Sequence, residues 1–279
     1  MLGLLKRLFA LGVSLGYVAV RDAMRALGGL VNRVQPPVPP VVLTYHALQA
    51  HEVTRFEAQM RRLRRHTTPV FADEEQPLNG RPAVAVTFDD AFQSVFEHAL
   101  PVLTRHQIPA TVFAPTGYLG TAPRWIPAAA RNGGRASVMS ADTLAALDAR
   151  LVKVGSHTVT HPHLAELSPH AIHSELAASK SYLERLKGTP VRMLSLPYGS
   201  CSSSVLEEAK TAGYNRVFAN VPVMGSRRDE AFTLIGRINV TLEDWPLEFD
   251  LKARGAYDWL SVAIPAKRVF AGLMRQTRS

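Results

Sequence analysis

The chain has 279 residues, of which 47% are hydrophobic and 20% charged, a composition that indicates a folded globular protein and excludes disorder over most of its length. Its one cysteine, Cys201, can close no disulfide within the chain and forms no CxxC motif, so histidine and carboxylate side chains have to hold any metal ion. Lysine and arginine outnumber aspartate and glutamate by 32 to 23. The formal charge of +9 favours anionic partners such as lipid headgroups, acidic glycans or nucleic acid.

The first 35 residues form a separate apolar and basic segment, which we expect to be a helix followed by a proline-rich linker. The uncharged run from Leu8 to Val20 is 13 residues long, whereas a membrane-spanning helix needs roughly 20. We therefore expect this helix not to cross a bilayer. It can pack on the outside of the domain or lie at the surface of an anionic membrane. Both interpretations stand ahead of a secretion signal, because no small-residue cleavage site follows.

Short β-branched runs alternate with stretches of helical periodicity from residue 40 onward. Strands are expected at residues 41–45, 83–88, 110–114, 151–155, 191–196, 216–219 and 233–240. Helices are expected at residues 53–66, 92–103, 167–187 and 203–212. Apolar strands separated by helices indicate a parallel sheet that is buried on both faces. We predict an α/β fold: a distorted, incomplete (β/α) barrel of about seven parallel strands with an added N-terminal helix.

Two adjacent carboxylates, Asp89 and Asp90, directly follow the expected strand at 83–88. Reactive groups in a parallel barrel stand at the C-terminal ends of the strands. Because side chains alternate along extended backbone, one of the pair can bind a metal ion while the other faces a substrate. The alternative interpretation is a helix N-cap aspartate followed by an acidic residue of the first turn.

Three histidines follow the expected strand at 151–155. His157 and His161 have the His-x-x-x-His spacing that lets two imidazoles reach one ion. Ten histidines in the chain make chance pairs common, so the position after a buried strand is what supports this pair. His163, beyond a proline, is expected to be a capping or surface residue.

Other candidates also stand at strand ends. Pro197 and Tyr198 precede a glycine and suit a cleft wall, although an ordinary turn has the same pattern. His46 follows the first expected strand and is a candidate general acid, with a purely structural histidine as the alternative. Arg237, in the last expected strand, can also reach this rim.

Together these groups form a set suited to hydrolysis. One aspartate and two histidines can hold a metal ion and leave coordination positions open for water and a substrate oxygen. The second aspartate would take a proton from the water, and a protonated histidine would deliver one to the leaving amine.

Three motifs resemble, in order and spacing, the first three motifs of the polysaccharide deacetylases, which are carbohydrate esterase family four with the NodB homology domain. They are Thr87-Phe-Asp-Asp90, Ser156-His157-Thr-Val-Thr-His161-Pro and Leu196-Pro-Tyr-Gly199. The resemblance covers residues 40 to 240 and implies an incomplete barrel. It also implies Asp89 as catalytic base, and Asp90, His157 and His161 as ligands of one divalent ion, usually zinc. Tyr198, next to Pro197, would supply a backbone amide to the oxyanion.

Three positions depart from the family pattern. Ala91 stands where a glycine usually follows the aspartates. Ser195 occupies the place of an arginine that orients the base, and Arg237 is our candidate to replace that arginine. The late Leu-x-His that supplies the acid is absent. Because Tyr45-His46 matches the early position in a branch resembling poly-N-acetylglucosamine deacetylases, we assign the acid to His46.

The resemblance divides the chain into an N-terminal helix at 1–35, a deacetylase domain at 40–245 and a basic, aromatic extension at 246–279. It implies a metal-dependent hydrolase that removes N-acetyl or other N-acyl groups from amino sugars of a bacterial polysaccharide or a lipid-linked glycan. O-acetyl ester hydrolysis is the nearest alternative chemistry. A metal-free barrel that only binds glycan is the alternative from a different class.

The arginines within residues 55–65 lack the interleaved aromatic residues of a nucleic-acid surface and are expected to form a solvated helix face. The expected partners are therefore the glycan and, peripherally, an anionic membrane, with no nucleic acid. We expect a cytoplasmic location or a place on the cytoplasmic face of a membrane, with export behind an N-terminal anchor as the alternative. The oligomeric state is left open.

Overall fold

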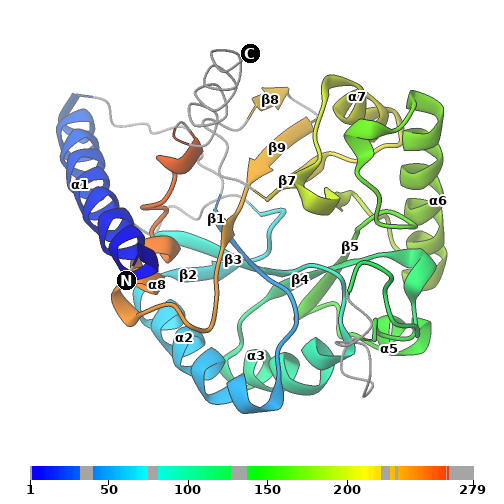
Figure 1. The fold of residues 1–279 in the computed structure, drawn as a ribbon, viewed down its shortest axis with the longest axis horizontal. Helices are drawn as coiled ribbons and strands as arrows, with labels where there is room; N and C mark the ends of the chain where they lie inside the picture. The colour runs from blue at the N-terminus through cyan, green and yellow to red at the C-terminus, as the bar shows by residue number, and fades with distance from the viewer. Residues whose placement is uncertain are drawn as a thin grey trace.

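The computed structural model describes residues 2–31, 40–74, 81–126, 137–220, 227–229, 232–261 and 263. All but the last residue of the expected linker at 34–40 lies outside the described residues, and so does most of the expected C-terminal extension, from residue 264 on. Helices surround a sheet that curves nearly into a barrel (Figure 1).

The strands are β1 (Val41–Tyr45), β2 (Thr68–Val70), β3 (Ala83–Phe88), β4 (Ala110–Ala114), β5 (Val152–Ser156), β6 (Met193–Ser195), β7 (Arg216–Ala219), β8 (Arg227–Asp229), β9 (Phe232–Gly236) and β10 (Ile238–Asn239). They are ordered β10-β1-β3-β4-β5-β6-β7-β9-β8, with β2 beside β3. All pairs are parallel except β8 with β9. The predicted α/β, nearly closed barrel is confirmed, and β2 and β8 are additions that the sequence pattern did not indicate.

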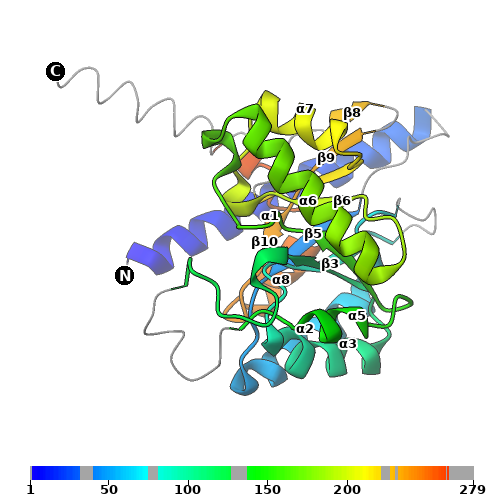
Figure 2. The ribbon, with the colours of Figure 1, turned by 90° about the vertical axis from the view of Figure 1, so that its right-hand side faces the viewer.

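The α-helices are α1 (Leu2–Val31), α2 (Val53–His66), α3 (Leu100–His106), α5 (Ala141–Ala145), α6 (Pro169–Lys187), α7 (Ser203–Thr211) and α8 (Pro246–Ala253). Shorter turns are η1 (Ala50–Glu52), the π-helix η2 (Val95–Ala99), η3 (Thr116–Tyr118), η4 (Leu164–Glu166) and η5 (Pro197–Gly199). In Figure 2, α6 and α7 lie on one flank of the sheet and α2, α3 and α5 on the opposite flank. α2 has the predicted bounds and buries Phe56, Met60 and Leu63. α6 begins two residues after the expected start at residue 167, with Ser168 as its N-cap.

The interior of the barrel is filled by a small apolar cluster that is separate from the main core between strands and helices. Its members are Val42, Ala72, Ala85, Phe113, Met193, Phe218 and Ile235. The rings of Phe113 and Phe218 lie 5.2 Å apart. Gly155 on β5 makes room for this packing, because a Cβ there would lie 2.5 Å from the Phe113 ring. The barrel is thus a packed core, and ligands have access only at its rim.

The last expected strand is broken at one residue. Its first half, β9, pairs with β7, and its second half, β10, pairs with β1. Arg237 lies between the two halves, at the point where the chain changes partners and nearly closes the barrel. The Arg237 side chain is fully buried there.

Backbone hydrogen bonds extend two strand pairs, β1 with β3 and β4 with β5, by one residue each. They place candidate residues on one rim. The amide of Asp89 donates to the carbonyl of Tyr45 at 3.0 Å, and the amide of His157 donates to the carbonyl of Ala114 at 3.0 Å. Because β3, β4 and β5 are parallel neighbours, the two candidate groups meet at the same end of the sheet.

The N-terminal helix α1 packs on the domain beside α8, and Leu11, Ser14 and Val18 are buried there. Its segment Gly3–Met24 is 22 residues long and, by length and composition alone, apolar enough to cross a membrane. We expected this helix not to cross a bilayer because its uncharged run has only 13 residues. The longer segment Gly3–Met24 is long enough, so length no longer argues against a spanning helix.

Candidate active site

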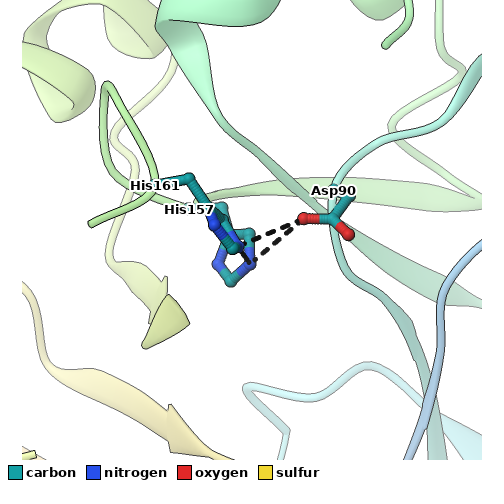
Figure 3. A group of neighbouring side chains, drawn as sticks. All are labelled: Asp90, His157 and His161. Carbon is teal, nitrogen blue, oxygen red and sulfur yellow. Dashed lines mark hydrogen bonds and ion pairs between the residues drawn. The ribbon is translucent and has the colours of Figure 1, made fainter. Parts of the chain in front are cut away.

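Asp90, His157 and His161 converge at the rim, although 67 residues or more separate the aspartate from the histidines (Figure 3). Nε2 of His161 lies 3.3 Å from Oδ1 of Asp90 and 3.2 Å from Nε2 of His157, and the third side of the triangle is 3.6 Å. Ligand atoms about 2.0 Å from a tetrahedral ion lie about 3.3 Å from one another. The three atoms therefore have the spacing of ligands around one cation.

The atoms that face one another in this triangle are hydrogen-bond acceptors unless one of them carries a proton. Oδ1 of Asp90 is buried and has no hydrogen-bond partner. Burial, followed by repulsion from Asp89, raises the pKa of Asp90 to about 7. A cation at the centre would remove both the unpaired acceptor and the need for that proton, so the residues fit a metal ion.

The histidines are held neutral, as metal ligands must be. Burial lowers the pKa of His157 to about 4 and that of His161 to about 3, with repulsion from His157 as the second cause for His161. Nδ1 of His157 donates to the carbonyl of Ser195 at 2.8 Å, which leaves the lone pair of Nε2 pointing into the site. Such a carbonyl partner is usual behind a ligating histidine.

The other carboxylate, Asp89, is bound by Arg237. Nη1 and Nη2 of Arg237 each donate to one oxygen of Asp89 at 2.7 Å, and Nη2 also donates to Oγ of Ser195 at 2.8 Å. Burial alone would raise the pKa of Asp89, but the charge of Arg237 and the Arg237 hydrogen bonds hold it well below its ordinary value. Asp89 is therefore an ionised, fixed carboxylate.

Aromatic rings line the open side of the site. Tyr198 is 47% exposed, and its ring lies edge-on to His161 with centroids 4.7 Å apart. Trp125 stacks on the ring of His161 with centroids 3.9 Å apart. His163 is exposed, makes no side-chain capping bond and stacks on Tyr198 at 4.0 Å. Pro197, before Tyr198, is buried.

His46 lies exposed one residue beyond the end of β1. Its charge contributes to the pKa of Asp89, His157 and His161, which places it within electrostatic reach of all three. The structure therefore brings every residue that the sequence proposed for the site to one rim.

The backbone of the site is strained. Among the described residues, six non-glycine residues have positive φ, and five of them are site residues or their neighbours: Asp90, Ala91, Thr158, His161 and Tyr198. Left-handed backbone costs about 1 to 3 kcal/mol at each such position and persists where the surroundings impose it. Such clusters are found where side chains are held for chemistry.

A sequence profile of the family described as polysaccharide deacetylase matches residues 78–217, which contain both aspartates, both histidines and Tyr198. The chain belongs to the polysaccharide deacetylase family. Its members are hydrolases that act on carbon–nitrogen bonds other than peptide bonds, and this deacetylase is therefore an enzyme of that class.

Two relatives support this membership. YxkH of Bacillus subtilis, a protein named for the same family, is 24% identical over 221 residues, which cover 75% of this chain and 74% of that one. A chitooligosaccharide deacetylase from a Bradyrhizobium species is 29% identical over 157 residues, covering 55% of this chain and 64% of the relative.

Solved structures share the fold. The Streptococcus pyogenes deacetylase PplD, in complex with acetate, has a TM-score of 0.63 at 20% identity and covers 78% of this chain and 99% of its own. IcaB from Ammonifex degensii has a TM-score of 0.61 at 24% identity, with 78% and 98% covered. At this identity the likeness establishes the barrel and not the substrate.

The departures of this deacetylase from its family pattern have structural reasons. Ser195 leaves room for Arg237, whose guanidinium reaches Asp89 from the strand break, and the Ser195 hydroxyl donates to Asp89 at 3.1 Å. Ala91 has φ of 46°, the left-handed backbone that glycine adopts at no steric cost. Alanine in place of glycine therefore adds strain beside the site.

One supporting residue was missed by sequence reasoning. Glu175 on α6 accepts the amides of Val159 at 2.8 Å and Thr160 at 2.9 Å, and the hydroxyl of Thr160 at 2.6 Å. It thus holds the loop between His157 and His161. A half-exposed glutamate within a regular helical pattern gives no signal of such a contact, because the bonds depend on the loop and not on spacing in the helix.

Proposed function

We propose that this deacetylase removes N-acetyl or other N-acyl groups from amino sugars of a polysaccharide or lipid-linked glycan, with one divalent metal ion. The observation that carries the proposal is the convergence of Asp90, His157 and His161 beside a second carboxylate, Asp89, with a separate counter-ion. Two neighbouring acids in opposite environments suit a division between metal binding and proton transfer.

The three converging residues would hold the ion through Oδ1 of Asp90 and Nε2 of each histidine. Mixed nitrogen and oxygen ligands without thiolate fit zinc, and they leave coordination positions open. A cation bound there polarises the amide carbonyl and lowers the pKa of a water molecule.

Each remaining residue has a proposed role in amide hydrolysis. Asp89 accepts a proton from the attacking water, since it is ionised and fixed by Arg237. His46 donates a proton to the leaving amine. The backbone amide of Tyr198 stabilises the oxyanion, and Pro197 fixes the turn that carries it. Arg237 acts as a positioning residue through Asp89.

We propose that the protein works at a membrane surface, on the cytoplasmic face, where a lipid-linked glycan would be presented; export behind the N-terminal helix is the alternative. The net charge of +9 and the apolar N-terminal helix support this location. Fractionation of cells that produce the chain with and without residues 1–35 tests it, and equal solubility of both forms would end it.

The chemistry is tested by acetate release from a panel of N-acetylated oligosaccharides, lipid-linked sugars and O-acetylated glycans, with and without chelator. We expect release from N-acetylated substrates that stops with chelator and returns with zinc. Release from the O-acetylated glycans alone would assign an ester hydrolase. A purified chain that binds glycan without ever holding metal would assign a binding protein.

Metal content provides an independent readout with a matched pair of variants. His161→Ala should abolish stoichiometric zinc, whereas His163→Ala, two residues away and exposed, should retain it. Equal metal content in both variants would contradict the proposed ligand set.

A further inference from the structure

The polar and apolar faces of α1 are reversed relative to those of an ordinary surface helix. A helix on a globular domain normally turns apolar side chains to the core and polar ones to water. The side of α1 that faces the domain instead holds Arg7, Ser14, Arg21 and Asp22, beside two buried apolar residues. In Figure 1, α1 lies at the edge of the molecule next to α8, outside the ring of helices.

The outward side of α1, its outer face, is apolar along its length. Its large side chains are between 47% and 70% exposed: Leu4, Leu5, Leu8, Phe9, Leu15, Val20 and Met24. Glycine and alanine occupy most of the remaining exposed positions within residues 3–24, and Lys6 is the one charged residue exposed there. In the described part of the chain, seven of the eleven large hydrophobic side chains that are exposed lie on this helix. A continuous apolar strip of this size indicates an interaction surface.

Polar contacts bind the inner side of α1 to the domain at points spread along the helix. Near the start of the helix, Arg7 donates to Glu248 at 2.6 Å. In its middle, Ser14 accepts from Trp259 at 2.9 Å. Further on, Arg21 donates to the carbonyl of Arg254 at 2.7 Å, and Asp22 accepts from Arg254 at 2.8 Å. The stretch from Arg7 to Asp22 is about 22 Å long at the rise of an α-helix. The domain therefore lies alongside most of the hydrophobic segment Gly3–Met24 of α1.

We propose that α1 lies in the plane of a membrane, with its outer face inserted among the lipid tails and its inner side still bound to the domain. A helix that crossed the bilayer would carry Arg7, Arg21, Asp22 and their partners into the hydrocarbon or break these contacts, and both are costly. In the plane of the interface, the same contacts stay on the aqueous side.

The chemistry of the surface selects lipid as the occupant. Apart from Lys6, the exposed side chains of the outer face form no hydrogen bonds that would fix a protein partner in register, whereas Lys6 and a net charge of +9 complement anionic headgroups. This inference rests on the membrane location proposed above and is independent of the deacetylase chemistry. A second copy of the chain on the same face is an outcome that the experiment separates.

Label depth in vesicles tests the orientation with the full chain. Single cysteines at Leu5, Gly16 and Ala23, which are exposed and share one side of the helix, carry a fluorescent label in a Cys201→Ser background, in vesicles of equal parts phosphatidylcholine and phosphatidylglycerol. Lipids brominated near the headgroup or near the tail end report depth. We expect all three labels to be shallow and equally quenched. A deep label at position 16 between shallow ones at 5 and 23 would show a spanning helix and overturn the in-plane arrangement while leaving the membrane location intact.

Vesicle binding of face variants tests the surface itself. Phe9→Glu with Leu15→Glu should weaken binding by at least about tenfold, because each apolar side chain withdrawn from lipid costs about that factor. Leu247→Glu, also exposed but on α8, is the matched control and should bind as the unmodified chain does. Equal binding by all three proteins would overturn the assignment of the outer face. An unmodified chain that ignores vesicles and dimerises through α1 would overturn the proposed membrane location as well.

Discussion

Asp89 and Asp90 are adjacent in the chain and lie in opposite environments. Asp89 shares a buried pocket with a guanidinium that binds both of its oxygens. Asp90 faces two neutral imidazoles and has an oxygen without any hydrogen-bond partner. Burial weakens both acids, yet the pKa of Asp89 is held low by Arg237 whereas that of Asp90 rises to about 7. The function of each carboxylate is therefore set by what other strands bring to it, not by the dipeptide.

The largest expected effect on activity comes from removing the charge of Asp89. Asp89→Asn removes the ionised proton acceptor and leaves the three proposed metal ligands untouched. We expect kcat/KM to fall by about 100- to 10,000-fold while bound zinc stays at one per chain. Asp90→Asn, the neighbouring control, should lose metal and activity together. Turnover of Asp89→Asn within tenfold of the unmodified enzyme would contradict the assignment of the base.

Arg237→Ala tests whether the guanidinium positions Asp89 or only stabilises the fold. Removing it leaves a buried carboxylate without its counter-ion, which costs about 3 to 5 kcal/mol of stability. The pKa of Asp89 should rise, because the charge that lowered it is gone, so the acidic limb of the kcat/KM profile should move to higher pH.

Arg237→Lys provides the control, since a single ammonium restores the charge without the paired hydrogen bonds. Its acidic limb should lie between those of the unmodified enzyme and Arg237→Ala. A limb that stays in place in both variants, with only the melting temperature lowered, would show a structural role.

The Asp90 side of the comparison predicts a pH-dependent metal affinity. With a pKa of about 7, Asp90 is protonated below that pH and has to release its proton to bind an ion, whereas His157 and His161 are already neutral. Zinc affinity should fall about tenfold for each pH unit below 7 and level off above it. Calorimetry in buffers of different ionisation enthalpy should find about one proton released on zinc binding at pH 6, where a metal-bound water is still largely protonated. No release at pH 6 would contradict the raised pKa.

The smallest expected effect concerns the loop that presents the histidines. Glu175→Ala leaves the amides of Val159 and Thr160 without their acceptor, and we expect about a tenfold loss in zinc affinity with Asp89 and Arg237 unaffected. Glu207→Ala, an exposed glutamate on α7, is the control. Equal zinc affinity in the two variants would show that the loop holds its own shape.

The sequence predicted the elements whose pattern is local. α2 has the predicted bounds because Phe56, Met60 and Leu63 recur at helical spacing, and α6 begins where Ser168 and Pro169 signal a start. The rim position of the aspartates and histidines followed from strand ends in a parallel sheet. What could not be predicted depends on tertiary contacts: the strand break at Arg237, the stacking of Trp125 on His161, and the grip of Glu175 on the loop.

The place of Arg237 between β9 and β10 has a consequence for synthesis of the chain. The carboxylate at position 89 is made early, and its counter-ion follows 148 residues later. During translation from the N-terminus, a nascent chain that ends before residue 237 already contains both adjacent acids. It does not yet contain the guanidinium that pairs with Asp89. Arg237 is the counter-ion of Asp89 and also lies where the barrel nearly closes through β10. A ribosome that stops before Arg237 therefore releases a chain without this counter-ion and without the closing strand.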